Sequence, residues 1–257
     1  MGDREITLKL TIAYDGTRYG GWQTQRGHQA AAPSIQQTIE TALQRITQQR
    51  VRLIGSGRTD AGVHAEGQVA HCRVRPSVRL ARLQRSLNSL LPLDIAIRRL
   101  SRAPESFHAR YSATRKWYRY RIWNGPVRDP FQHRFVHHIR VPLHLAAVRR
   151  AARFFIGRHD FKRFQTTGRP VRSTVRTMYR LTIRRQGPLI TMDIEADGFL
   201  YRMVRAVAGT LMEIGKGRWT PEVADAMLKD RRCRWSCVTA PACGVTLMRV
   251  SYARRER

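Results

Sequence analysis

The sequence predicts an α+β protein made of two similar halves, each a mainly antiparallel sheet with helices on one face. Two observations predict this class. Runs that alternate apolar and polar residues are interspersed with runs of helical periodicity, and the order of elements in the first half broadly recurs in the second. A chain of 257 residues can form one large domain or two medium ones. We expect the halves to be residues 1–108 and 109–257, with a cleft between them.

The first half begins with an expected strand over residues 6–14, a β-rich run in which apolar and polar residues alternate. Ser34 and Gln37 have capping-box spacing, which predicts a helix start. The apolar face of that helix consists of residues at helical spacing: Ile35, Ile39, Ala42, Leu43 and Ile46. The same two periodicities predict the rest of this half: strands at 51–54 and 67–74, a helix at 80–91 and a strand at 94–100.

The second half begins with an expected strand over residues 115–124, which ends at an Asn-Gly turn. A hairpin around Gly187-Pro188 is expected to join strands at 173–185 and 188–196. The remaining expected elements are helices at 143–156 and 199–214 and a closing strand at 244–252. The helix at 199–214 is expected to have an apolar stripe, formed by Leu200, Val204, Val207 and Leu211, and to carry Arg202, Arg205 and Gly209 on another face.

The charge of the chain is strongly positive. It has 48 Lys and Arg against 18 Asp and Glu, a formal net charge of +30, and nearly all of its cations are arginines. A folded protein this basic usually binds a polyanion, and arginine binds phosphate in bidentate fashion, so nucleic acid is the expected partner. The chain has neither a membrane-length apolar run nor a signal-peptide pattern at its start. We therefore expect a cytoplasmic protein without a membrane partner.

The four cysteines do not predict a metal site. Cys72 is isolated in the sequence, and the spacing of Cys233, Cys237 and Cys243 lacks a clear fourth ligand. Reduced, partly buried thiols are the expected state.

One acidic residue, Asp60, occurs early in the Gly-rich stretch "GSGRTDAGVHAEGQVAHC" at residues 55–72. Asp is common in turns because its side chain caps local amides, so a purely structural role is one interpretation. An ionised carboxylate in a nucleic-acid site repels phosphate, however, and is better explained by chemistry than by affinity. The second interpretation is a nucleophile or a general base.

Several blocks of the sequence, in the same order, resemble the tRNA pseudouridine synthase A family. The most specific is "GRTDAGVHAEGQVAH" at residues 57–71. The others are "YDGTRYGGWQ" at 14–23, "SIQ" at 34–36, "SFHARYSATRKWYRY" at 106–120, "GFLYRMVRAVAGTLMEIGKG" at 198–217 and "TAPACGVTLMRVSY" at 239–252. The resemblance covers essentially the whole chain.

The resemblance implies a ferredoxin-like pseudouridine synthase fold with a central RNA-binding cleft. It implies a homodimer that isomerises uridine to pseudouridine at positions 38, 39 and 40 of the tRNA anticodon stem-loop, without cofactor or metal. Asp60 matches the catalytic aspartate of the family. Two routes stay open for it: covalent attack on the substrate, or removal of the C2′ proton to form a glycal.

The resemblance also assigns roles to other residues. Tyr118 matches the tyrosine that packs on the flipped uracil, and Arg205 matches the arginine that pairs with the catalytic aspartate. Arg58 matches the arginine that enters the helix stack to turn the uridine out. The residues expected to bind RNA are Arg58, Phe107, His108, Ala109, Arg110, Tyr111, Gly168, Arg169 and Arg172. Arg202 and Ala206 depart from the family pattern.

Two other functions are compatible with parts of the sequence. A non-catalytic tRNA-binding module or RNA chaperone would need the same charge and aromatic residues. A hydrolase could use Asp193, Glu195 and Asp197, which alternate along one expected strand.

Overall fold

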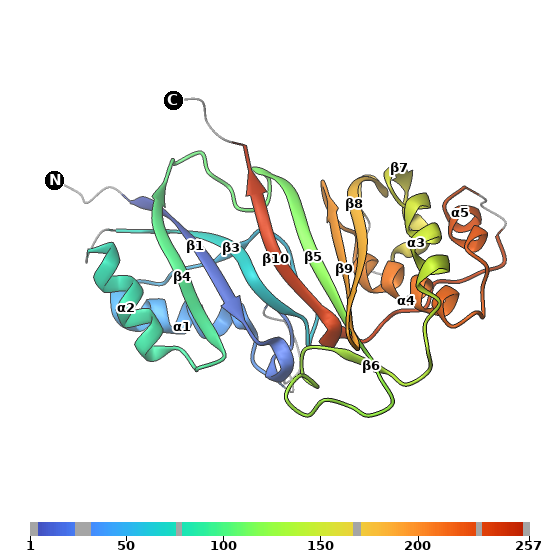
Figure 1. Ribbon diagram of the computed structural model, residues 1–257. Coiled ribbons are helices and arrows are strands. Elements are labelled where there is room, and N and C mark those ends of the chain that lie inside the picture. The colour runs from blue at the N-terminus through green and yellow to red at the C-terminus, as the bar shows by residue number, and fades with distance from the viewer. Residues whose placement is uncertain (1–4, 24–31, 76–78, 167–170, 230–232, 254–257) are drawn as a thin grey trace. The chain divides into compact units, whose positions relative to one another are not determined.

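The computed structural model describes residues 5–23, 32–75, 79–166, 171–229 and 233–253. The chain divides into two compact units. The first unit comprises Met1–Thr114 and Leu247–Arg257, and the second comprises Arg115–Thr246. The last strand of the chain therefore belongs mostly to the first unit, although it follows the second in sequence (Figure 1).

The first unit is a sheet with two α-helices. Its elements are β1 (Ile6–Tyr14), α1 (Ile35–Thr47), β2 (Ile54–Gly55), β3 (His64–Val74), α2 (Leu80–Leu90), β4 (Ile95–Ala103) and most of β10 (Val245–Tyr252). The strand order is β4-β1-β3-β10, and β2 pairs with β3 outside this path. Strand β1 runs antiparallel to both β3 and β4, so it is a central strand, which agrees with the complete burial of Leu8, Leu10 and Ile12.

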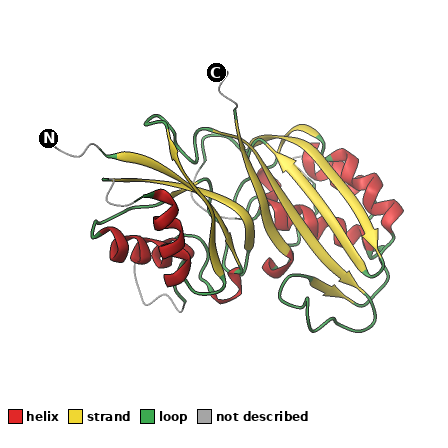
Figure 2. Cartoon of the chain, turned by 60° about the vertical axis from the view of Figure 1, so that its left-hand side comes forward, coloured by secondary structure: helices red, strands yellow, loops and turns green. Residues whose placement is uncertain are grey.

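Helix α1 begins where the sequence predicts. The Ser34 side chain accepts a hydrogen bond of 3.1 Å from the Gln37 amide, which satisfies one of the unpaired amides of the first turn. The helix ends at Gln48, whose φ of 55° leaves the right-handed helical region. Helices α1 and α2 pack on each other, α2 contacts β4, and the two helices lie on one face of the sheet (Figure 2).

The second unit is a sheet with the helices α3, α4 and α5. Its elements are β5 (Ala113–Asn124), β6 (His137–Ile139), α3 (Leu145–Phe154), β7 (Gly157–Asp160), β8 (Val175–Gln186), β9 (Leu189–Ala196), α4 (Met203–Gly215) and α5 (Glu222–Lys229). The strand order is β5-β9-β8-β7, all antiparallel, with β6 parallel to β5. Helix α3 packs against α4, α5 and β8, so these helices cover one face of this sheet (Figure 2).

The α+β class, with mainly antiparallel sheets and helices on one face, is confirmed. Among the α-helices and strands of the described residues, α5 and the short strands β6 and β7 were not predicted. The strand expected at 51–54 is wrong in extent, since only Ile54 and Gly55 pair with β3. The helix expected from residue 199 begins at Met203, because Arg202 has a φ of 59° and interrupts the helical backbone.

Candidate functional site

Asp60 lies in the loop between β2 and β3, which residues 56–63 form. The Val63 amide donates to the Asp60 carbonyl over 3.1 Å, so residues 60–63 form a tight turn. Gly62, the third residue of that turn, has a φ of 77°, a conformation that favours glycine. The glycine in the "TDAG" run is therefore required by the turn that follows the aspartate.

Gln68 on β3 holds the start of this loop. Its Oε1 accepts from Ser56 Oγ over 2.7 Å, and its Nε2 donates to the Gly57 carbonyl over 3.0 Å. The Ser56 amide also donates to the Val69 carbonyl over 2.7 Å. Gln68 and Ser56 are fully buried, so water competes little for the bond between their side chains.

Thr59 holds the middle of the loop, between the two side chains to which the sequence assigns functions. It is buried, whereas Arg58 is exposed and Asp60 is half-buried. Thr59 Oγ1 lies 2.8 Å from the hydroxyl of Tyr14, and the Trp22 amide donates to the Thr59 carbonyl over 3.0 Å. An inward threonine between two less buried residues lets Arg58 and Asp60 be presented away from the core.

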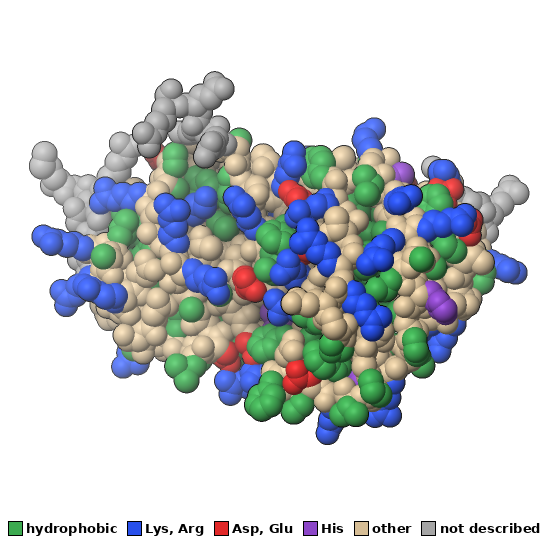
Figure 3. Space-filling model, in the orientation of Figure 1, with side chains coloured by type: hydrophobic (Ala, Val, Ile, Leu, Met, Phe, Trp, Pro, Cys, Tyr) green, Lys and Arg blue, Asp and Glu red, His purple; other side chains and the backbone are tan. Residues whose placement is uncertain are grey.

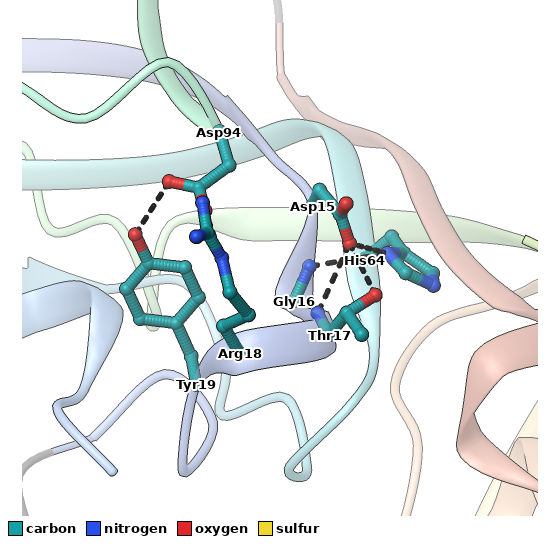
Figure 4. Close-up of polar contacts among 7 residues, drawn as sticks. All are labelled: Asp15, Gly16, Thr17, Arg18, Tyr19, His64 and Asp94. Carbon is teal, nitrogen blue, oxygen red and sulfur yellow. Dashed lines mark hydrogen bonds and ion pairs between the residues drawn. The ribbon is translucent and has the colours of Figure 1, made fainter. Parts of the chain in front are cut away.

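A second hydrogen-bonded cluster fixes the segment that follows β1 (Figure 4). The Asp15 carboxylate accepts from the Thr17 amide over 3.0 Å and lies 3.1 Å from His64 Nδ1. The Gly16 amide donates to the same His64 nitrogen over 3.1 Å. A Cβ at Gly16 would lie 2.0 Å from the Val63 carbonyl oxygen, so this segment touches the end of the Asp60 loop backbone to backbone.

Asp94 fixes the other side of that segment (Figure 4). It accepts from the Tyr19 hydroxyl over 2.6 Å and from Arg18 Nη2 over 2.7 Å. The Asp15 amide donates to the Asp94 carbonyl over 2.9 Å. The segment next to the Asp60 loop is thus held both by β3 and by the residue that precedes β4.

The expected RNA-binding residues 107–111 form a compact turn between β4 and β5. His108 Nδ1 accepts from the amides of Arg110 (3.2 Å) and Tyr111 (3.1 Å), and its ring stacks on Tyr111 with centroids 4.3 Å apart. Ala109 is buried: its amide donates to His71 Nδ1 over 3.1 Å, and its carbonyl accepts from Tyr252. Arg110 and Tyr111 are exposed, with 77% of Tyr111 accessible, so they are the members of this set available to a ligand.

The Lys9 ammonium lies over the rings of Phe107 and Tyr252, 5.0 and 4.2 Å from their centroids. These two rings also contact each other, with centroids 5.1 Å apart. Phe107 therefore helps to attach the turn to the sheet, which is a structural contribution that the sequence alone did not reveal.

We predict that acid loosens this turn through His71. Burial, then the neighbouring His108, lowers the pKa of His71 below its usual 6.5. The unfolded chain therefore binds the proton at a higher pH than the folded chain does. The stability associated with neutral His71 is present above about pH 6.5 and is lost as the pH falls from there through the folded-state pKa.

Replacing His71 by Asn should reduce this pH dependence, because the Asn amide oxygen can still accept from the Ala109 amide and does not titrate. Urea unfolding of both proteins at neutral and at mildly acidic pH measures the difference. An equal loss of unfolding free energy in the two proteins would contradict the role given to His71.

In the second unit, Tyr118 and Tyr120 share the buried face of β5, whereas Trp117 and Arg119 lie on the opposite face, as the alternation predicted. The Tyr118 ring makes an edge contact with Phe199, with centroids 5.0 Å apart. Tyr120 is completely buried and its hydroxyl donates to the Pro241 carbonyl over 3.1 Å. Tyr120 is therefore a core residue, and Tyr118 is the tyrosine next to a second aromatic side chain.

Arg205 is the one residue of α4 that is not buried. The predicted apolar stripe is buried, as expected, but the remaining residues of the helix other than Arg205 are buried as well. The segment around Ala240 covers this helix closely: a Cβ at Gly209 would lie 1.8 Å from the Val238 carbonyl oxygen. Arg205 and Ala240 bind each other twice, through Arg205 Nε to the Ala240 carbonyl (2.7 Å) and the Ala240 amide to the Arg205 carbonyl (3.1 Å).

The acidic residues of β9 have structural partners. Asp193 accepts from Trp117 Nε1 over 2.8 Å and from Arg119 Nε over 2.8 Å. Glu195 lies within ion-pair distance of Arg115 and Arg180. Asp197 comes after the end of β9, and its carboxylate accepts from the Thr177 amide. These contacts explain the three acids without a hydrolytic site.

The remaining predicted residues give less information. Arg172 is exposed, and Gly168 and Arg169 lie outside the described residues. Arg202 caps the start of α4 with its left-handed backbone, and Ala206 is buried.

No metal site or membrane helix is seen in the described part of the chain. Groups of three or more His, Cys, Asp or Glu side chains able to hold a metal ion are absent there. Cys72 is buried, and Cys233, Cys237 and Cys243 are half-buried free thiols. Within the same ranges, none of the helices has both the length and the apolar character needed to cross a membrane.

Sequence reasoning missed Tyr14, Trp22, Thr59 and Gln68 as determinants of the Asp60 loop. All four belong to blocks that carry the family resemblance, so the signal was present as motif membership. The contacts between these residues could not be predicted from the sequence, because Tyr14 and Thr59 are 45 positions apart.

Comparison with known proteins agrees with the resemblance. A family model described as tRNA pseudouridine synthase matches residues 10–112 and 151–253. A protein of Moorella thermoacetica named tRNA pseudouridine synthase A is 45% identical over 245 residues, which cover 95% of this chain and 99% of the relative. A protein of the same name from Syntrophotalea carbinolica is 44% identical over 249 residues, 97% of each chain. A third, from Chlamydia muridarum, is 43% identical and covers 95% of this chain and 91% of its own.

Proposed function

The chain belongs to the tRNA pseudouridine synthase family, and from this premise we propose the substrate, the positions modified and the residues that act. The enzyme is an isomerase that converts uridine to pseudouridine in tRNA. The bond from ribose C1′ to N1 of uracil breaks, and C1′ is rejoined to C5 of the same base. The C5 hydrogen then leaves, and N1 takes up a proton, so the reaction needs no redox partner.

More narrowly, the proposed sites are positions 38, 39 and 40 of the anticodon stem-loop, as the resemblance in the Asp60 motif implies. A homodimer belongs to the same proposal and rests on the same resemblance. A cytoplasmic location is proposed from the sequence pattern described above. The division of the chain at residues 108 and 109 stays a prediction.

Charge recruits the tRNA in this proposal. The chain carries a formal net charge of +30, and Lys and Arg side chains are spread widely over the face drawn in Figure 3. Phosphate contacts of this kind attract any nucleic acid and release counterions, so they supply affinity but no chemistry. Arg110 and Tyr111, both exposed, are the proposed contacts from the turn after β4.

Asp60 is the proposed catalytic residue, and Arg58 is proposed to enter the stack from which the uridine is turned out. The observation that supports these roles most directly is the buried Thr59 between them, which fixes the backbone from which both side chains extend. Whether Asp60 attacks the substrate or removes the C2′ proton is left open. In both routes its carboxylate must be ionised and correctly placed.

Tyr118 and Arg205 complete the proposed site. The Tyr118 ring, which is 8% exposed and contacts Phe199 edge-on, is the proposed stacking partner of the flipped uracil. Arg205 is proposed to pair with Asp60 by the family's pattern. Within its own unit, Arg205 Nε donates to the Ala240 carbonyl over 2.7 Å, which restricts the position of the guanidinium group.

The experiment that tests the function is tritium release from unmodified tRNA that carries uridines labelled at C5. The label leaves C5 only when the base is rejoined through that carbon, so release reports the complete isomerisation. Mapping the modified nucleotides in the product then tests positions 38 to 40 separately. Tight tRNA binding without release by the wild-type protein would overturn the enzyme and favour the non-catalytic binding module.

A further inference from the structure

The loop that bears Asp60 is connected to the end of β1 by a pair of buried hydroxyl groups. The Tyr14 hydroxyl lies 2.8 Å from Thr59 Oγ1, and the two residues are 5% and 6% exposed. Burial raises the pKa of Tyr14 well above its usual value, so the phenol is uncharged and keeps its proton at every pH at which the protein works. Because both groups are buried, water does not compete for this hydrogen bond, and the bond restricts the threonine side chain strongly.

The backbone of Thr59 is held from the same segment. The Trp22 amide donates to its carbonyl over 3.0 Å. Gly21, with a φ of 98°, lies flat against this peptide, so that a Cβ there would be 2.6 Å from the Thr59 carbonyl oxygen. The Trp22 indole packs against Gly55, the residue of β2 that precedes the loop, and its ring centroid is 6.2 Å from that of Tyr14.

Both the side chain and the carbonyl of Thr59 are therefore fixed by residues 14–22. Asp60 is the next residue in the chain. The next constraint is the turn closed by the Val63 amide on the Asp60 carbonyl. Between these two constraints the position of the Asp60 Cα has little freedom, and the carboxylate can differ only by its own side-chain rotation.

We propose that Tyr14 and Thr59 are positioning residues for the reaction: their hydroxyl pair sets the place of the Asp60 carboxylate. The proposal rests on the proposed role of Asp60 as the catalytic residue. Neither side chain needs to touch the substrate. Small misplacements of a reacting group reduce turnover strongly while leaving distant binding contacts intact, so kcat is the quantity that should respond.

The test is Tyr14→Phe, which removes only the hydroxyl group. We expect kcat in the tritium-release assay to fall by about 10-fold or more. KM and the affinity for tRNA should change by less than about twofold, since the phosphate contacts are untouched. A fall in tRNA affinity that accounts for the whole loss, with kcat unchanged, would overturn the proposal.

Tyr19→Phe is the matched control. Tyr19 is 6% exposed and belongs to the same segment. The substitution also removes one hydroxyl hydrogen bond, but the partner is Asp94 and not the Asp60 loop. We expect the kcat of Tyr19→Phe to stay within about threefold of wild type, even if its melting temperature falls as far as that of Tyr14→Phe. An equal loss of kcat in the two variants would show that the effect is general destabilisation.

Substitutions of Thr59 test the same hydroxyl pair independently. Thr59→Ser keeps the hydroxyl group and should retain most of kcat, whereas Thr59→Val removes it and should match Tyr14→Phe. The Tyr14→Phe/Thr59→Val double variant should be no slower than the slower single variant, because both remove the same bond. Fully multiplicative losses would contradict a shared role, and inactivity of the wild type in the same assay would instead refute the proposed function.

Discussion

Replacing Asp60 by Asn should lower turnover on unmodified tRNA by about 10³-fold or more, while tRNA still binds. Asn has nearly the same shape as Asp, so the turn closed by the Val63 amide on the residue 60 carbonyl should survive. What is lost is the charge and basicity of the carboxylate, on which both the nucleophilic and the glycal route depend. Affinity should stay equal or rise slightly, because one repulsive charge next to the phosphates disappears.

Tritium release and a separate tRNA-binding measurement, made on the same preparations, check this result. Asp225→Asn is the matched control: it also removes one negative charge, from a surface pair with Lys229 on α5 at 2.8 Å. Such pairs contribute little to stability, so wild-type turnover is expected there. If Asp60→Asn retained more than about a tenth of wild-type turnover, Asp60 would not be the catalytic residue.

Raising the salt concentration should weaken tRNA binding by roughly 10³-fold between about 50 and 200 mM, if six or more phosphates are contacted. The physical reason is that each phosphate neutralised by Lys or Arg releases condensed counterions, and this release is less favourable in concentrated salt. The net charge of +30 and the scarcity of lysine among the cations make arginine the main contributor.

A binding titration at several salt concentrations gives the slope of log affinity against log salt. The same series with Arg110→Gln should lower that slope by about one, because one exposed phosphate contact is removed. The matched control is Arg150→Gln, since Arg150 is engaged by Glu222 in a surface ion pair. A nearly flat slope for the wild type would mean that base and sugar contacts supply most of the affinity, and that the excess charge has another origin.

Local sequence was sufficient for much of the fold. The alternation over residues 115–124 placed Tyr118 and Tyr120 on one face of β5 and Trp117 and Arg119 on the other, as found. The Ser34 cap and the glycine after Asp60 were readable for the same reason. Caps, turns and strand alternation depend on residues a few positions apart, so the sequence records them directly.

Helix α4 shows where local pattern fails. The predicted apolar stripe is buried, but so is every other residue of α4 except Arg205, including Gly209, which was predicted on another face. The backbone near Val238 fits against Gly209, and this contact buries a side that the sequence left open. Burial depends on what packs on a helix, and periodicity within the helix does not contain that information.

The sequence was enough to predict the class of fold and the family, and to single out Asp60 as the expected catalytic residue, because the long motif around Asp60 and the periodicities are local. The contacts that hold the loop around Asp60 are visible only in the tertiary structure. It brought Tyr14 to Thr59 across 45 positions, matched Asp193 to Trp117 and Arg119, and returned the end of the chain to the first unit. Each of these depends on which distant segments pack together, a choice set by the burial of the whole chain and not by any one segment.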